Sequence, residues 1–116
     1  NHLKITGSIS EAVQLARKKV SFTKKIEVEA SSAEEALEAA EARADIVLLD
    51  NMIPQEISKV IKILKERQVR SRVFLEASGG IKSENIKAYS ETGIDAISIG
   101  WITHSAKNID FSLEII

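Results

Sequence analysis

The chain has 116 residues, a net charge of −1 and no cysteine. This length fits one domain, the mixed charges give no reason to expect nucleic acid or an anionic membrane surface, and the lack of cysteine excludes disulfides and thiolate chemistry. No apolar run is long enough to span a membrane and no signal peptide is visible, so we expect a cytoplasmic protein.

The first third of the chain predicts a helix, a strand and a second helix. The segment Ser8-Ile9-Ser10-Glu11 has the spacing of a capping box, and the apolar residues after it recur at helical intervals, which predicts a helix over about 9–19. Residues 25–30 alternate between apolar and acidic types, which predicts a strand. A second capping box, Ser32-Ala33-Glu34-Glu35, begins a helix whose inward stripe consists of small residues.

The middle of the chain continues the alternation of strand and helix. Residues 46–49 are all apolar and lead into Asp50, as expected for a strand of a parallel sheet that helices cover. Pro54 is typical of a first helical turn, and the apolar spacing after it predicts a helix to about residue 67. The next apolar run, residues 73–77, predicts a third strand.

The last third of the chain predicts one more helix and strand before a tail. Ser83 is positioned to cap a fourth helix, and Gly93 is a typical C′ residue at its end. A fourth strand is predicted over residues 96–99, and a short helix around residues 105–108 precedes the tail.

Together these elements predict an α/β fold with four βα units preceded by a helix. Short connections imply a parallel sheet with right-handed crossovers. A complete eight-unit barrel needs about 250 residues, and the sequence opens at Asn1 without a methionine. We therefore expect a portion of a parallel α/β barrel (TIM-like) rather than a smaller α/β unit. A half barrel exposes two sheet edges, which favours self-association.

The ends of the predicted strands carry the candidate site residues. In parallel α/β folds, function sits at the carboxyl ends of the strands. Those ends are Glu29, Asp50, Ser78-Gly79 and Gly100, and they are expected to converge on one rim. Such a rim suits a phosphorylated ligand, because glycine-rich strand ends present bare backbone N–H groups.

Two of these residues, Glu29 and Asp50, are carboxylates on adjacent strand ends. They could accept hydrogen bonds from sugar hydroxyls, or hold Mg²⁺ directly or through water. In the alternative interpretation Glu27 and Glu29 are only the polar side of a half-exposed strand, and Asp50 is only a helix cap or turn former.

Two glycine-containing loops are candidate phosphate sites. Ser78-Gly79-Gly80-Ile81 follows the third strand and opens into a helical pattern, and Gly100 is followed by Thr103-His104-Ser105. Taken alone, the first loop could be an ordinary turn and His104 a capping or surface residue. Their occurrence after two successive strands is more specific than either loop, because barrels commonly bind phosphate after their last two strands.

The chain resembles quinolinate phosphoribosyltransferase almost from end to end. The motifs that carry the resemblance are Lys25-Ile26-Glu27-Val28-Glu29, Leu48-Leu49-Asp50-Asn51-Met52, Leu75-Glu76-Ala77-Ser78-Gly79-Gly80-Ile81, Thr92-Gly93-Ile94-Asp95 and Gly100-Trp101-Ile102-Thr103-His104-Ser105. The resemblance implies the C-terminal part of the barrel domain of an NAD-pathway enzyme. Such enzymes combine quinolinate with phosphoribosyl pyrophosphate, release pyrophosphate and CO₂, and use Mg²⁺.

The resemblance also implies roles for individual residues. Glu29 and Asp50 would bind the ribose hydroxyls and the metal. The 5′-phosphate would be held by Ser78, Gly79, Gly100 and His104. The family's amino-terminal domain and first barrel half, which bind the quinolinate carboxylates, are absent from residues 1–116, and a homo-oligomer is expected. The sequence departs from the family at two positions. Arg43 stands where a small residue, usually glycine, is expected, and Trp101 stands where a small residue is usual.

Three alternatives remain open from the sequence. One is a sister phosphoribosyltransferase on the same scaffold, either nicotinate-specific or associated with molybdenum transport. Another is a non-catalytic half-barrel that serves only in folding or assembly. The third is a phosphate-binding barrel isomerase or lyase, which would need a rim lysine or an acid/base pair that the strand ends do not offer.

Overall fold

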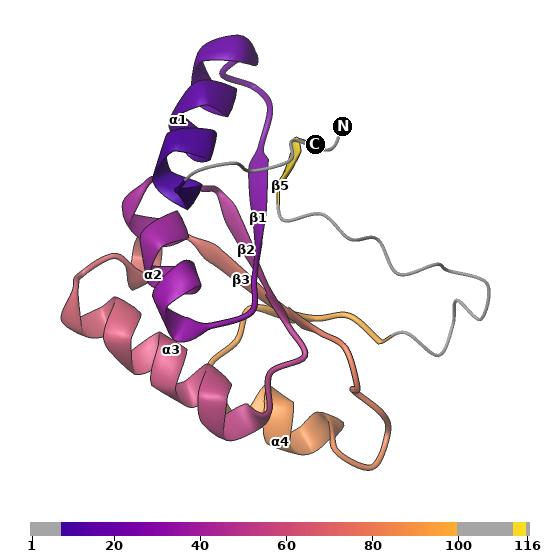
Figure 1. Ribbon diagram of the computed structural model, residues 1–116. Helices are drawn as coiled ribbons and strands as arrows, with labels where there is room; N and C mark the ends of the chain where they lie inside the picture. Colours follow the sequence, from indigo (N-terminus) through magenta and orange to yellow (C-terminus); the bar gives the residue numbers. More distant parts are fainter. Residues whose placement is uncertain (1–7, 100–112, 116) are drawn as a thin grey trace.

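The computed structural model describes residues 8–99 and 113–115 (Figure 1). The expectations for Gly100, Trp101, His104 and the helix at 105–108 therefore lie outside the described residues. In chain order the elements are α1 (Ile9–Lys19), β1 (Ile26–Ala30), α2 (Ala33–Glu41), β2 (Ile46–Asp50), α3 (Pro54–Glu66), the 3₁₀ turn η1 (Arg70–Arg72), β3 (Phe74–Ser78), α4 (Ile86–Ser90), β4 (Ala96–Ile97) and β5 (Leu113–Ile115).

The strands form one sheet in the order β4-β3-β2-β1-β5. Strands β1 to β4 run parallel, each beside the next in the chain, so the predicted α/β fold with successive βα units is confirmed. The sequence analysis did not predict β5, which pairs antiparallel with β1 and places Glu27 opposite Glu114. β5 thus covers the edge of β1 that faces away from β2.

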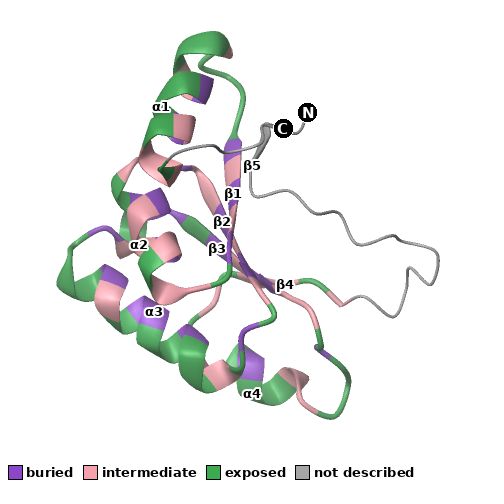
Figure 2. Ribbon diagram, viewed as in Figure 1, coloured by how far each residue is buried: buried purple, intermediate pink, exposed green. Residues whose placement is uncertain are grey.

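The hydrophobic core lies between the sheet and helices α1, α2 and α3, which gather on one side of it (Figure 1). In β1, β2 and β3 every second residue is buried in this core (Figure 2): Ile26, Val28, Ala30, Val47, Leu49, Leu75 and Ala77. The alanines at 36, 39 and 40 let α2 approach the strands closely, while α3 contributes the larger Ile57 and Leu64. The inward stripe of α2 therefore consists of small residues, as predicted.

The intervening strand residues form the second face of the sheet, called here the open face, which is half-buried or exposed. It carries Glu27, Glu29, Ile46, Leu48, Asp50, Phe74, Glu76 and Ser78. The expectation that residues 46–49 are buried on both sides is wrong, because only Val47 and Leu49 are buried in β2. In β3, Phe74 is 46% exposed on the open face.

The predicted starts of the first three helices are confirmed. Ser8 Oγ accepts a hydrogen bond from Glu11 N–H at 3.1 Å, and Ser32 Oγ accepts one from Glu35 N–H at 3.1 Å, so each serine satisfies a donor that the helix leaves unpaired. Pro54 is the first residue of α3, where its missing N–H costs nothing.

The predicted start of α4 at Ser83 is wrong, because the helix begins at Ile86. The side chain of Asn85 explains the delay: its Oδ1 accepts from Lys82 N–H at 2.7 Å and its Nδ2 donates to Gly80 O at 3.0 Å. These bonds hold the preceding residues in a turn. Gly93 has the expected positive φ of 93° but lies two residues beyond the cap, Glu91.

Strand limits also differ slightly from those predicted. β1 begins at residue 26 rather than 25, and β3 begins at residue 74 rather than 73. β4 stops at Ile97 instead of residue 99, although Ser98 N–H still donates to Ala77 O at 2.8 Å.

Helices α2 and α3 end in the same left-handed turn. Arg43 has a φ of 71° and Gln68 a φ of 60°. Ala44 N–H donates to Ala39 O at 3.0 Å, and Val69 N–H donates to Leu64 O at 2.9 Å, which is the six-residue bond of a Schellman motif. Glycine would suit this backbone best, and Arg43 occupies it under strain.

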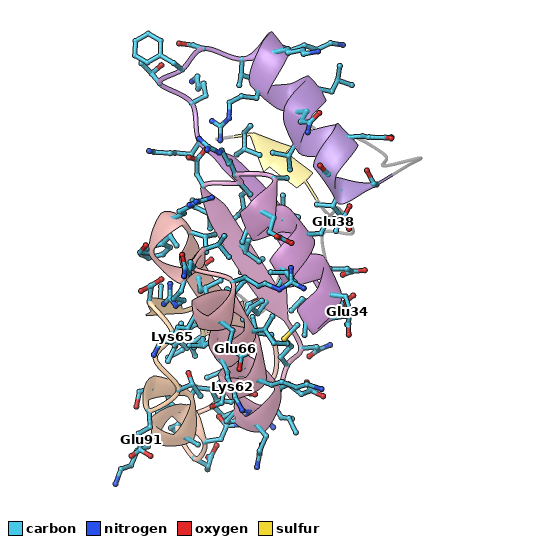
Figure 3. All side chains as sticks on the ribbon, turned by 90° about the vertical axis from the view of Figure 1, so that its left-hand side faces the viewer. Glu34, Glu38, Lys62, Lys65, Glu66 and Glu91 are labelled. Carbon is cyan, nitrogen blue, oxygen red and sulfur yellow. The ribbon has the colours of Figure 1, made fainter. Side chains whose placement is uncertain are left out.

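The outward faces of the helices are charged. Seen from the helical side, Glu34 and Glu38 project from α2 and Lys62, Lys65 and Glu66 from α3 (Figure 3). Among the described residues, none of the helices has the length and apolar character needed to cross a membrane.

Candidate functional site

The carboxyl ends of β2 and β3 bring two predicted site residues side by side. Asp50 and Ser78 are register partners and are the last residues of their strands. One residue further, Asn51 N–H donates to Ser78 O at 2.9 Å, which extends the pairing beyond the strands. The loops after β2 and β3 are therefore joined by a backbone hydrogen bond where they leave the sheet.

Glu29 joins this group from the next strand. It pairs in register with Leu48, which precedes Asp50 by one alternation, so Glu29 and Asp50 are diagonal neighbours on the open face. Glu76 is also a partner of Leu48, on β3, and lies two residues before Ser78. The structure thus places Glu29, Asp50 and Ser78 on one face near one end of the sheet, as predicted.

Asp50 is half-buried, and within residues 8–99 its carboxylate forms no hydrogen bond or ion pair. The alternative reading of Asp50 as a helix cap is not what the structure shows. The N-cap of α3 is Ile53, whose N–H donates to the carboxylate of Glu56 at 3.2 Å. A half-buried carboxylate at a strand end is therefore accessible to water or to a ligand.

Gly79 lies against the loop that follows β2. Its φ is 88°, and a Cβ at this position would lie 2.8 Å from Asn51 Oδ1 and 3.1 Å from Asn51 N. Glycine is required here for two reasons, the positive φ and the contact with Asn51. Sequence reasoning did not single out Asn51; the signal was an asparagine directly after a strand, since asparagine tolerates left-handed backbone and Asn51 has a φ of 56°.

The loop after Gly79 differs from the expected one. Gly80 has a φ of 69°, and nothing lies within 4 Å of the position of its absent Cβ. The expectation that this loop opens directly into a helix is wrong, because α4 begins six residues after Gly80 and has only five residues. Any anion held here would bind the loop's own N–H groups rather than a helix N-terminus.

The wide groove of about 1130 Å³ lies at the opposite end of the sheet, where β2 and β3 begin. Its acidic residues already have partners. Asp45 pairs with Arg17 at 3.0 Å, and Asp95 pairs with Arg70 at 3.1 Å. Because parallel α/β folds place their chemistry at the carboxyl ends of the strands, we locate the candidate site at Asp50 and Ser78 rather than in this groove.

Comparison with known protein families matches almost the whole chain. The family model of the quinolinate phosphoribosyl transferase C-terminal domain matches residues 1–114. The chain belongs to the quinolinate phosphoribosyl transferase family. In this family model the matched part is the C-terminal domain, and the described strands β1 to β4 all lie within it.

Relatives from archaea and eukaryotes are similar in sequence to nearly the whole chain. A probable nicotinate-nucleotide pyrophosphorylase (carboxylating) of Methanothermobacter thermautotrophicus is 54% identical over 99% of the chain, which covers 41% of that relative. The human nicotinate-nucleotide pyrophosphorylase (carboxylating) is 44% identical over 99% of the chain, which covers 38% of it. The chain therefore spans about two fifths of the length of these relatives.

Solved structures agree with the fold. A crystal structure of a NadC deletion mutant superimposes with a TM-score of 0.77 at 38% identity, over 98% of this chain and 38% of that one. The nicotinate-nucleotide pyrophosphorylase from Francisella tularensis gives a TM-score of 0.75 at 40% identity, over all of this chain and 39% of that one. The prediction of part of a TIM-like α/β barrel is confirmed.

The donor set at the rim is compatible with Mg²⁺. Glu29 and Asp50 offer carboxylate oxygens, the ligands that Mg²⁺ prefers. Among the described residues no three histidine, cysteine, aspartate or glutamate side chains cluster closely enough to hold a metal by themselves. Mg²⁺ commonly binds through one or two carboxylates together with substrate phosphates and water, so these two carboxylates are donors of the kind that this ion takes.

Proposed function

We propose that this chain forms the C-terminal part of the catalytic barrel of a nicotinate-nucleotide pyrophosphorylase (carboxylating). The enzyme would transfer the phosphoribosyl group of phosphoribosyl pyrophosphate to quinolinate and yield nicotinate mononucleotide, pyrophosphate and CO₂. The observation that carries the proposal is the alignment of Asp50 with Ser78 at one end of the sheet, with Glu29 diagonally beside them. The names of the relatives support the same activity.

The whole activity needs more chain than is present here. We propose that an amino-terminal domain and the first half of the barrel complete the active site in a longer polypeptide, and that these parts bind the carboxylates of quinolinate. The proposal agrees with the length of the relatives, of which the chain covers 41% and 38%. We further propose a cytoplasmic homo-oligomer whose partners are small-molecule substrates.

The carboxylates would act on the ribose. As the bond between the anomeric carbon and pyrophosphate breaks, positive charge develops on the ribose ring, and fixed negative charges nearby lower the energy of that state. Asp50 suits this role because it is half-buried and has no hydrogen-bond or ion-pair partner within residues 8–99. Glu29 and Asp50 would also accept hydrogen bonds from the ribose hydroxyls, which orients the anomeric carbon toward the quinolinate nitrogen.

The loop after β3 would hold the 5′-phosphate. Ser78 offers a hydroxyl, and Gly79 and Gly80 offer N–H groups that no side chain of their own shields. Gly100 and His104 are assigned to the same phosphate on the resemblance alone. Mg²⁺, bound by Glu29 and Asp50 directly or through water, would neutralise charge on the leaving pyrophosphate.

A chimeric enzyme tests the proposal. The chain replaces the matching 115-residue segment of the Methanothermobacter relative, and both proteins are assayed for formation of nicotinate mononucleotide from quinolinate and phosphoribosyl pyrophosphate. We expect a folded chimera that makes the product, and one in which Asp50→Asn removes most of the activity. A folded chimera that is inactive while the parent relative is active would contradict the proposal.

A further inference from the structure

Asn51 stands out at the rim because it connects two segments that the proposed function uses separately. It follows Asp50 directly, and its own N–H donates to Ser78 O at 2.9 Å. One residue thus adjoins a proposed ribose-binding carboxylate on one side and is bonded to the phosphate loop on the other.

The side chain of Asn51 lies against Gly79. Its Oδ1 is 2.8 Å from the position that a Cβ of Gly79 would occupy, so the amide fills the space that a side chain at position 79 would need. This contact limits how closely the loop after β3 can approach the loop after β2. Gly80, one residue further, has no such neighbour within 4 Å.

The fold itself gives Asn51 little other reason to be asparagine. The residue is exposed, and α3 takes Ile53 as its N-cap. Its φ of 56° explains a preference for asparagine or glycine over other residues. Glycine would satisfy the backbone equally well, so the backbone alone does not account for the amide.

We propose that Asn51 is a positioning residue, whose side chain sets the place of the Ser78–Gly79 loop relative to Asp50 so that one ligand can reach both. The inference rests on the proposed function, since the ligand is phosphoribosyl pyrophosphate. Asn51 acts through Gly79, and its loss should therefore weaken binding of the phosphorylated substrate more than it slows the chemical step.

The test is Asn51→Gly in the full-length protein that carries the chain. This variant removes the amide and keeps a residue that accepts the positive φ. We expect the KM for phosphoribosyl pyrophosphate to rise about fivefold to tenfold, as when one polar contact is lost, with kcat changed less than about twofold. The Kd for phosphoribosyl pyrophosphate, measured by calorimetry without quinolinate, should rise by the same factor.

Two further variants make the test specific. Gln68→Gly is a matched control, because Gln68 also has a positive φ, of 60°, but lines the groove at the other end of the sheet. The KM of this variant for phosphoribosyl pyrophosphate should equal that of the wild type. The double variant Gly79→Ala/Asn51→Gly should bind phosphoribosyl pyrophosphate better than Gly79→Ala alone, because the contact with Oδ1 is removed. The rescue should be partial, since Asn51 N remains 3.1 Å from the new methyl group.

The outcomes separate this inference from the proposed function. A wild-type protein that neither binds phosphoribosyl pyrophosphate nor forms product would contradict both. An active wild type whose Asn51→Gly variant keeps its KM and Kd would overturn the role of Asn51 only. If Asn51→Gly fails to fold, Asn51→Asp decides: it keeps the shape and places a negative charge beside the phosphate, so a raised Kd supports the inference and an unchanged Kd refutes it.

Discussion

Asp45 and Ile26 exchange two hydrogen bonds at the start of the sheet. Asp45 N–H donates to Ile26 O at 2.9 Å, and Asp45 Oδ2 accepts from Ile26 N–H at 2.8 Å. The carboxylate accepts the hydrogen bond that a backbone carbonyl of a neighbouring strand would otherwise accept. Arg17 of α1 forms an ion pair with the same carboxylate at 3.0 Å. One side chain thus closes the sheet at its amino end and ties α1 to it.

Asp95 repeats the arrangement at the start of β4, where it bonds to Leu75 of β3. Asp95 N–H donates to Leu75 O at 3.0 Å, and Asp95 Oδ2 accepts from Leu75 N–H at 2.8 Å. Here the cation is Arg70, which also donates to Val73 O and Gly93 O. The two aspartates therefore have the same function in the β1–β2 and β3–β4 pairs.

The first prediction concerns the hydrogen bond from Ile26 N–H to the carboxylate of Asp45. Asp45→Ala should lower the free energy of unfolding by about 1–3 kcal/mol, because Ile26 is fully buried and its N–H would lose its acceptor. Asp45→Asn keeps an acceptor oxygen and should cost less than about 1 kcal/mol, close to the cost of Arg17→Ala. Urea unfolding of the three variants is the measurement. Equal losses for the alanine and asparagine variants would show that the charge, not the hydrogen bond, matters.

A second prediction follows from the strained turn after α2. Arg43→Gly should raise the free energy of unfolding by about 1 kcal/mol, since glycine accepts a φ of 71° without a Cβ penalty. Arg43→Ala is the control and should give no gain, because alanine keeps the Cβ. If both variants are equally stabilised, the arginine side chain and not the backbone is responsible.

The glycine loop offers a third prediction. Gly79→Ala should impair phosphoribosyl pyrophosphate binding and reduce stability together, because its methyl group meets Asn51 within 2.8 Å. Gly80→Ala carries the strain of a positive φ without that contact, so its Kd should change much less. Calorimetric Kd values and thermal unfolding of the two variants are compared. A larger effect at Gly80 would place the ligand beside that residue instead.

A fourth prediction tests the carboxylates. In the full-length enzyme, Asp50→Asn and Glu29→Gln should each lower kcat about 10²–10³-fold, the usual cost of removing a group that stabilises transition-state charge. The double variant should lose less than the product of the two factors, because under the proposed function both groups would act on one ribose and one metal.

Glu27→Gln is the matched control for these carboxylates. Glu27 lies on the same strand and the same face, but two residues further from the rim. Its kcat should stay within about twofold of the wild type. If all three single variants lose kcat equally, any loss of charge on the open face lowers kcat. The assignment of the site to Glu29 and Asp50 would then be wrong.

The fifth prediction is self-association of the isolated chain. The open face exposes Phe74, which is 46% accessible, and the outer side of β4 is unpaired among the described strands. Sedimentation of residues 1–116 should show dimers or larger species, which Phe74→Lys reduces. Phe22→Lys, at a residue that is 93% exposed in the turn after α1, should have no such effect. A monodisperse monomer with cooperative unfolding would contradict the prediction.

Local signals predicted most of the fold. The serine caps at Ser8 and Ser32 and the proline at position 54 marked three helix starts, because these residues act within a few positions of themselves. The start of α4 was missed because the side chain of Asn85 bonds backward to Lys82 and Gly80. Strand β5 was missed because its pairing with β1 joins residues far apart in the chain, and no local pattern encodes that partner.

The candidate site was predicted less completely than the fold. Strand ends revealed Asp50 and Ser78, since a polar residue that closes an apolar run is visible in the sequence. The contact between Asn51 and Gly79 depends on how two loops meet, which spacing alone does not determine. Outside the candidate site, the structural roles of Asp45 and Asp95 were also missed, although each directly precedes a predicted strand and that shared position was the available signal.

The one-sided core divides each strand into two independent sets of residues. Val47 and Leu49 hold the protein together, while Leu48 and Asp50 between them are half-buried on the open face. Substitutions at Leu48 or Asp50 should therefore leave the packing between the sheet and the helices intact, whereas substitutions at Val47 or Leu49 should disturb it. Residues that hold the helices onto the sheet and residues that lead to the rim can thus be varied separately, although they alternate along a single strand.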